Sequence, residues 1–359
     1  MSTHFHSLRV KQVEADTDEA VIVSFDVPDT LKDQYRFTQG QHLTLRSQIG
    51  GTEQRRSYSI CSGVDDDALR IGVRKVPGGL VSNWINEQLH AGDTIDVLPP
   101  EGRFFVPVDA QAARHYLGIA GGSGITPILS IMKTVLAREP LSRFTLIYGN
   151  RRQKSTMFKE EIEDLKNRYL TRLELHLVFS QELMDTPLNS GRLSQQKLAE
   201  FLGPVVQPQH IDQVFVCGPH GFNDEADAAL RAAGIAQERI HIERFGVPVN
   251  VDGKAPVQTV LAGDAPQAKV LIIRDGLSRE IDFRTDQGNI LDAAAQAGLE
   301  VPYSCKSGVC CTCRAKLIEG KVRMERNFAL EAHEVAAGYV LTCQSHPLTE
   351  RVVISFDER

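Results

Sequence analysis

Hydrophobic and polar residues alternate in short runs along the first third of the chain, with the two-residue period of half-buried β-strands. Turn-forming residues separate the runs, for example at Gln39-Gly40 and at Pro77-Gly78-Gly79. Residues 81–89 have the spacing of a helix instead. Many short strands with a single helix predict a small antiparallel β-barrel over residues 1–110. The predicted strands are residues 8–13, 21–27, 42–46, 56–60, 69–73 and 94–97.

Apolar strands then alternate with helices over residues 111–246. The helix after the first of these strands has apolar residues at i, i+3, i+4, i+7 and i+8, counted from Ile128. This alternation predicts an α/β doubly wound domain with a parallel sheet, whose ligands bind at the carboxyl ends of the strands. The predicted strands are residues 116–120, 144–148, 173–179, 213–216 and 240–242, and helices are expected at 158–167, 195–202 and before Ala233.

Residues 247–267 are rich in Pro, Gly, Val and Ala without a helical period, which predicts an extended linker. Beyond it, a hairpin, a helix at residues 290–297 and further strands predict an α+β domain over residues 268–359. A polar helical stretch is expected up to Glu334, and residues 351–356 are expected to close the sheet. The chain of 359 residues is long enough for this multidomain arrangement.

Charge and cysteine content narrow the possible functions. Lys and Arg total 40 against 46 Asp and Glu, a formal net charge of -6, which argues against a nucleic-acid partner bound through its phosphates. No apolar run approaches the length of a membrane span, and the first ten residues lack the basic and apolar regions of a signal peptide. Seven cysteines, several of them clustered, are typical of a reducing compartment. We therefore expect a cytoplasmic protein with no membrane or nucleic-acid partner.

Four cysteines near the C-terminal end have the spacing of iron–sulfur ligands. Cys305, Cys310 and Cys313 form C-x4-C-x2-C, and Cys343 follows at a distance, as in a plant-type [2Fe–2S] site. A zinc site usually has paired C-x2-C units, and an odd number of cysteines in a chain of this length does not suit a disulfide framework. Using Cys311 as a ligand would give C-x5-C-x-C, so we treat Cys311 as a non-ligand.

Two stretches of the predicted barrel suit a ligand that carries phosphate. Arg56 and Tyr58 face the same way on a strand, so a guanidinium could bind phosphate beside a ring that stacks on an aromatic group. Gly79 opens a helix that Ser82 or Asn83 could cap, and a helix N-terminus is a ready anion site. The alternatives are an ordinary barrel surface and an ordinary helix start.

The second domain has a glycine-rich turn where a pyrophosphate would bind. Gly121 to Gly124 follow the first strand, and Thr126 could cap a helix that has Pro127 at its first position. The turn departs from G-x-G-x-x-G, so it is not the usual dinucleotide fingerprint. Arg151, with Arg152 and Lys154 nearby, would suit a phosphate, although a solvated basic loop is the alternative.

Arg56-Ser57-Tyr58-Ser59, the 121–127 turn and Cys217-Gly218-Pro219 together resemble the ferredoxin–NADP reductase superfamily over residues 1–246. The remainder resembles a plant-type ferredoxin of the β-grasp fold. The resemblance implies that the flavin phosphates bind Arg56, that the isoalloxazine stacks on Tyr58, and that Ser59 lies near its N5 atom. It also assigns the flavin pyrophosphate to Gly79 and Ser82.

The same resemblance assigns residues around the nicotinamide. Cys217 would lie beside the nicotinamide, Arg151 would meet the 2′-phosphate of NADPH, and Phe245 would be the closing aromatic residue near the flavin. Ser59 and Cys217 are thus the expected catalytic residues. The dinucleotide itself would bind Gly121, Gly122, Ser123, Gly124 and Thr126.

A reductase followed by a ferredoxin is the domain order of reductase components of multicomponent oxygenases. The resemblance implies electron flow from NADPH to FAD, to a [2Fe–2S] cluster and on to an oxygenase, which we take to be a diiron enzyme. FAD is favoured over FMN by the resemblance, and NADPH over NADH by Arg151. A reductase for a Rieske ring-hydroxylating dioxygenase or another monooxygenase stays open, as does a non-catalytic metal-binding interaction module.

Overall fold

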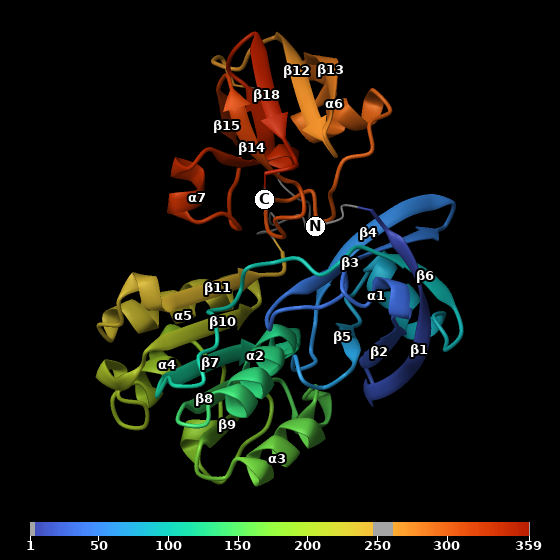
Figure 1. The fold of residues 1–359 in the computed structure, drawn as a ribbon. Coiled ribbons are helices and arrows are strands. Elements are labelled where there is room, and N and C mark those ends of the chain that lie inside the picture. The colour runs from blue at the N-terminus through green and yellow to red at the C-terminus, as the bar shows by residue number, and fades with distance from the viewer. Residues whose placement is uncertain (1–3, 247–260, 359) are drawn as a thin grey trace. The chain divides into compact units, whose positions relative to one another are not determined.

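The computed structural model describes residues 4–246 and 261–358, which form two compact units divided between Phe245 and Gly246 (Figure 1). Most of the predicted linker, residues 247–260, lies outside the described residues. None of the helices in the described ranges is long and apolar enough to cross a membrane.

The first unit begins with an antiparallel sheet in the order β4-β3-β6-β1-β2-β5. A bridge between Ile60 and Ile71, with the Cys61 N–H donating to the Arg70 carbonyl at 2.9 Å, joins the end of β4 to β5 and closes the barrel. The closed barrel surrounds a core of buried aliphatic side chains, which the alternating pattern predicts. The elements are β1 (His6–Thr17), β2 (Ala20–Asp26), β3 (His42–Ile49), β4 (Thr52–Ser59), β5 (Leu69–Arg74), α1 (Leu80–Glu87) and β6 (Thr94–Val97).

The second half of this unit is a parallel sheet in the order β11-β10-β7-β8-β9. The order reverses at β7, so the doubly wound arrangement is confirmed. The strands are β7 (His115–Gly121), β8 (Arg143–Asn150), β9 (Leu173–Phe179), β10 (Gln213–Gly218) and β11 (Ile240–Arg244). One face is covered by α2 (Ile125–Arg138) and α3 (Lys159–Arg168), and the other by α4 (Gln195–Phe201) and α5 (His220–Ala232) (Figure 1).

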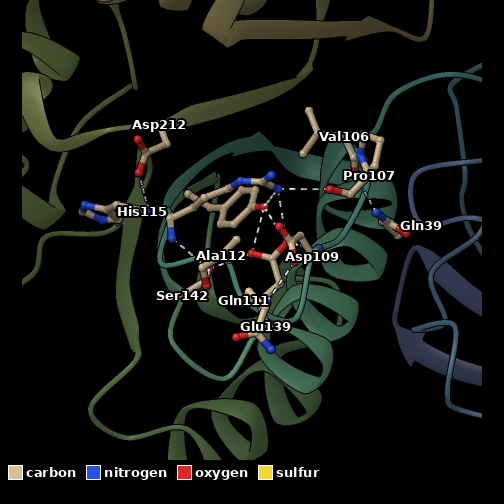
Figure 2. Close-up of polar contacts among 12 residues, drawn as sticks. Gln39, Val106, Pro107, Asp109, Gln111, Ala112, His115, Glu139, Ser142 and Asp212 are labelled. Atoms are coloured by element: carbon tan, nitrogen blue, oxygen red, sulfur yellow. Dashed lines mark hydrogen bonds and ion pairs between the residues drawn. The ribbon is translucent and has the colours of Figure 1, made fainter.

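A buried carboxylate organises the region where the chain enters the parallel sheet (Figure 2). Glu139, at the end of α2, is fully buried and accepts hydrogen bonds from the Tyr116 hydroxyl at 3.0 Å and from Ser142 Oγ at 2.6 Å. The Asp109 N–H donates to it at 3.0 Å and Arg114 at 3.3 Å. These contacts lie at the amino end of β7, whereas ligands of such sheets bind at the carboxyl ends. We therefore interpret Glu139 as a structural residue.

The second unit is a mixed sheet in the order β13-β12-β18-β14-β16, with a separate β15-β17 pair. Its α6 (Ile290–Gln296) packs on the sheet and ends before Gly298, which has a φ of +73°. The other elements are β12 (Gln267–Arg274), β13 (Leu277–Arg284), β14 (Arg314–Glu319), β15 (Val322–Met324), α7 (Ala332–Ala336), β16 (Tyr339–Leu341), β17 (Ser345–Pro347) and β18 (Arg351–Ser355).

Two predictions for this unit are wrong. The stretch up to Glu334 contains β15 and only the short helix α7, because Val322 and Met324 alternate with Arg323 and pack against the core as strand residues do. The strand β18 lies in the middle of the sheet, parallel to β12 and antiparallel to β14, and does not close it. A central strand is buried on both faces, as residues 352–355 are.

The last residues of the predicted linker contact the second unit. The Asp264 carboxylate pairs with Arg323 at 2.6 Å, and the Ala265 N–H donates to the Pro347 carbonyl at 2.9 Å. Gln267 already belongs to β12. These contacts favour a ferredoxin-like domain that starts a few residues before residue 268. The position of the domain boundary stays a prediction.

Candidate functional site

The carboxyl ends of β7 and β10 meet at the glycine-rich turn. A Cβ atom on Gly124 would lie 2.0 Å from the carbonyl oxygen of Cys217, so only glycine fits there without a backbone shift. Gly122 has a φ of +55°, in the region that glycine favours. The turn predicted for the pyrophosphate and the cysteine predicted beside the nicotinamide are therefore adjacent.

The prediction that Thr126 caps the helix is wrong. The helix α2 begins at Ile125, and the Thr126 hydroxyl donates to the Ser123 carbonyl at 3.0 Å. The residues Gly122–Gly124 form a 3₁₀ turn that leads directly into the helix, so the helical backbone starts before Thr126 and Pro127. The Ile125 N–H bonds back to the Gly122 and Ser123 carbonyls and Pro127 has no N–H, so the positive end of the α2 dipole, and not a full set of unpaired N–H groups, favours an anion here.

Ser59, Cys217 and Glu243 come together from three strands. Ser59 ends β4, and its Oγ lies 3.2 Å from Glu243 Oε2. Glu243 is the register partner of Cys217 across β10 and β11. Burial raises the pKa of Glu243 to about 8, while burial and the nearby Glu243 raise the pKa of the Cys217 thiol well above its ordinary value. The site therefore holds a thiol and a carboxyl group that stay protonated near neutral pH.

Glu243 was missed by sequence reasoning. The only signal was an acidic residue at the end of an apolar strand, within two positions of Phe245, and such residues are usually solvated. Phe245 itself lies just beyond β11, and its side chain is exposed.

Arg56 and Tyr58 lie on β4 in two different environments. Arg56 is exposed and donates to the carbonyl of Arg55 at 2.7 Å, whereas Tyr58 is half-buried against the barrel core. Ser57, between them, meets Thr44 Oγ1 at 3.0 Å on the neighbouring strand. An exposed guanidinium two positions from a ring held by the core suits a ligand with both phosphate and an aromatic system.

The helix α1 starts differently from the prediction. Gly79 is its N-cap, and neither Ser82 nor Asn83 caps it. Ser82 Oγ instead accepts from the Val76 N–H at 3.2 Å, which holds the preceding turn, and the Asn83 N–H bonds to the Gly79 carbonyl at 3.3 Å. Because no side chain among the described residues caps α1 with a hydrogen bond, its first turn suits an anion.

The basic loop after β8 brings its cations to the same edge of the sheet. Arg151, Arg152 and Lys154 directly follow Asn150, the last residue of β8. The Asn150 side chain is buried, and within the described residues neither amide atom has a partner in hydrogen-bonding geometry. Sequence reasoning did not single out Asn150, because an amide after a strand is usually solvated.

The four predicted cluster ligands form two pairs of interacting thiols. Cys305 interacts with Cys310, and Cys313 with Cys343. The hydrogen bond from Cys310, together with the Ser307 N–H at 3.4 Å from Sγ, lowers the pKa of Cys305 to about 5. Nowhere in the described ranges do three such ligands converge on a single ion. Two pairs of sulfurs with N–H donors around them fit a two-iron cluster.

The neighbouring Cys311 has a different orientation. Its backbone φ is +56°, and its Sγ donates to the Ala329 carbonyl at 3.2 Å. A thiol that bonds to a backbone carbonyl is not directed at the other four sulfurs. The choice of Cys310 over Cys311 as a ligand stays a prediction from the spacing.

Comparison with known proteins covers nearly the whole chain. Residues 7–106 match the oxidoreductase FAD-binding domain, residues 119–227 the oxidoreductase NAD-binding domain, and residues 272–348 the 2Fe-2S iron-sulfur cluster binding domain. The chain is 44% identical to a subunit of 1,2-phenylacetyl-CoA epoxidase from Escherichia coli (strain K12), over 99% of both chains. The chain belongs to the FAD- and NAD-binding reductases that carry a [2Fe–2S] ferredoxin domain.

Two further comparisons extend over nearly the whole length of both chains, and a third covers part of a longer chain. The ferredoxin reductase component of 3-ketosteroid-9-alpha-monooxygenase from Rhodococcus rhodochrous is 33% identical over 97% of this chain and 96% of its own. Phthalate dioxygenase reductase shares the fold with a TM-score of 0.55, at 23% identity over 98% of both chains. A type IV self-sufficient cytochrome P450 monooxygenase has a TM-score of 0.67, at 21% identity, over 98% of this chain and 41% of its own.

The chain is therefore an NAD(P)H-dependent oxidoreductase, the electron-transfer reductase of a multicomponent oxygenase, with FAD and a [2Fe–2S] cluster as cofactors. When bound, these cofactors supply the conversion of a two-electron hydride into single electrons. The chain's own residues bind and orient them. In this reductase Ser59 and Glu243 join the barrel to the parallel sheet, and the Gly124 turn places α2 against Cys217.

Proposed function

We propose that this chain is the reductase subunit of a phenylacetyl-CoA epoxidase system, with a diiron oxygenase as its electron acceptor. The observation that carries the proposal is the 44% identity to the Escherichia coli epoxidase chain over 99% of both chains. Three stretches, residues 54–60, 118–131 and 304–315, also resemble the reductase subunit of the bacterial epoxidase in sequence.

In this proposal the flavin site is built on the barrel. Arg56 binds the flavin phosphates, Tyr58 stacks on the isoalloxazine and Ser59 lies near N5. The start of α1, at Gly79 and Ser82, receives the pyrophosphate, and this is supported by the lack of a side-chain cap on this helix within the described residues.

The nicotinamide site lies at the carboxyl edge of the parallel sheet. Cys217 lies beside the nicotinamide, and Phe245 covers the flavin from the end of β11. The residues that bind the dinucleotide are Gly121, Gly122, Ser123, Gly124, Thr126 and Arg151. The cluster ligands are Cys305, Cys310, Cys313 and Cys343, a choice supported by their pairing.

NADPH is the proposed donor because three cations follow β8. Replacing Arg151 with Ala should raise the KM for NADPH by about tenfold or more, the loss expected for a charge-assisted phosphate contact of about 1.5–3 kcal/mol. The KM for NADH should change far less. Equal effects on both donors would remove the assignment of NADPH.

Reconstitution tests the proposed partner. The purified reductase is combined with the catalytic subunits of a phenylacetyl-CoA epoxidase, and NADPH-dependent consumption of phenylacetyl-CoA is measured. Turnover that depends on the reductase is the expected result. Reduction of artificial acceptors without such turnover, together with support of a Rieske ring-hydroxylating dioxygenase or a 3-ketosteroid monooxygenase, would contradict it.

The remaining expectations concern partners and location. We propose that the oxygenase is the protein partner and that the reductase works in the cytoplasm, without a membrane or nucleic-acid partner. This is supported by the acidic balance of -6 and by cysteines that serve as ligands.

A further inference from the structure

Glu19 places a carboxylate beside the proposed dinucleotide site. It lies in the turn between β1 and β2, and its Oε2 accepts a hydrogen bond from Arg74 at 2.7 Å. Its own N–H donates to Thr17 Oγ1 at 3.2 Å, and its carbonyl accepts from the Lys75 N–H at 2.7 Å. The turn therefore fixes the backbone from which this carboxylate projects.

Arg74 connects Glu19 to the glycine-rich turn. It is the last residue of β5, and a Cβ atom on Gly122 would lie 3.2 Å from its Nη1. Its side chain is 20% exposed, whereas that of Glu19 is 52% exposed. The guanidinium thus lies against the turn that would receive a pyrophosphate, and the carboxylate covers it from the solvent side.

Two more cations act on the same carboxylate. The pKa of Glu19 is lowered, chiefly by Arg74 and to a smaller extent by Arg151 and Lys154 of the loop after β8. Beside this turn is a hollow of about 570 Å³, lined by Lys75, Lys154 and the residues around Glu19. Cations from the barrel and from the parallel sheet therefore act on Glu19, and its turn borders a hollow that Asp16 and Asp18 also line.

We propose that Glu19 competes with the phosphates of the nicotinamide dinucleotide, occupying Arg74 and its neighbouring cations until a phosphate replaces it. A guanidinium binds carboxylate and phosphate through the same planar fork, so it cannot serve both fully. The phosphate prevails because it carries more charge and contacts the turn N–H groups as well. Glu19 thereby weakens binding of the dinucleotide and eases its release. This inference rests on the proposed dinucleotide site.

The test replaces Glu19 with Gln in the full-length protein, with Asp18→Asn as the matched control. Asp18 lies in the same turn and lines the same hollow, so its replacement changes the net charge equally. E19Q should lower the Kd for NADP⁺ by about two- to fivefold, the range for an exposed ion pair. D18N should lower it by less than half as much. Titration of the protein with NADP⁺ and with NAD⁺ gives these constants.

Single-turnover reduction of the flavin by NADPH separates binding from reaction. The limiting rate should be the same in E19Q and the natural protein, because Glu19 is not among the residues around Cys217. Unchanged or weaker binding in E19Q would overturn the proposal, and so would an equal gain in D18N. Arg151→Ala could weaken the binding of NADPH and NADH alike while E19Q tightens the binding of both. In that case the assignment of NADPH as the donor fails, and the competition between Glu19 and the phosphates stands.

Discussion

The cysteine loop and the site around Cys217 are assembled in opposite ways. Three of the four predicted cluster ligands lie on one loop before β14, and the fourth, Cys343, comes from a distant segment. The other site takes one residue from each of three strands, and its Ser59 and Glu243 are 184 positions apart. The residues of a site on one loop can be recognised from their spacing in the sequence. A site built from three strands, in contrast, forms only when the barrel and the sheet have folded together.

The largest effect should come from the cysteine loop. Cys310→Ser should abolish the visible absorption of the [2Fe–2S] cluster, because one iron would lose a thiolate ligand. Cys311→Ser should keep the spectrum, since the Cys311 thiol bonds to the Ala329 carbonyl. Absorption and EPR spectra of the two purified variants check this. The reverse pattern would show that the loop uses Cys311, and that spacing misleads even for a local site.

A substitution in the glycine-rich turn probes the assembled site. Gly124→Ala brings a Cβ within 2.0 Å of the Cys217 carbonyl, so the turn and β10 must separate. A displacement of about 1 Å at a reacting centre can slow the reaction by about 10²-fold, and we expect hydride transfer to fall by about this factor. Stopped-flow flavin reduction measures the rate.

Gly221→Ala is the control for this substitution. Gly221 lies in α5, and a Cβ there meets nothing within 4 Å. Its rate should match that of the natural protein, with stability unchanged or slightly improved by the better helix propensity of alanine. If Gly124→Ala behaved like Gly221→Ala, the contact between the turn and β10 would not matter for the reaction.

The next prediction concerns the stability of the first unit and the buried residue Glu139. Glu139→Gln replaces an acceptor of several hydrogen bonds with a group that also carries N–H donors, and should destabilise the first unit by about 1.5–3 kcal/mol. Urea unfolding followed by flavin fluorescence measures the loss. Glu163→Gln, which removes an exposed ion pair to Lys159, should cost about 0.3–0.5 kcal/mol. An equal, small cost for both would show that the Glu139 network is not structural.

The last prediction concerns pH. Burial raises the pKa of Glu243 from 4.5 to about 8, so between these values the unfolded chain releases a proton that the folded chain keeps. The free energy of unfolding therefore falls as pH rises through this range, and the contribution of this carboxyl group to the fall is complete above about pH 8. Between pH 5 and 8.5 the melting temperature of the natural protein should fall more than that of Glu243→Gln. The difference should be about 2–4 °C for each kcal/mol of stability that ionisation of Glu243 removes. Parallel melting curves would contradict a half-buried Glu243 that stays protonated near neutral pH.

Much of the fold was readable because its patterns are local. The strand runs of the barrel, the strand–helix alternation and the C-x4-C-x2-C spacing each depend on residues close in sequence. Errors occurred where a side chain takes a partner that the hydrophobic pattern does not record. Ser82 bonds back to Val76, Thr126 donates to Ser123, and Met324 packs as a strand residue, and none of these choices follows from local propensity.

The sequence by itself determined the types of domain and their order and predicted the cluster ligands, because periodicity and short spacing act within a few residues. Only the tertiary structure decided which groups surround Cys217, since Glu243 is placed there by the pairing of β10 with β11 and Ser59 by a side-chain contact from the barrel. It also decided that Glu19, an ordinary turn residue in the sequence, faces Arg74. A carboxylate changes its pKa and its partners only when folding removes water and brings distant charges close, and spacing along the chain records neither.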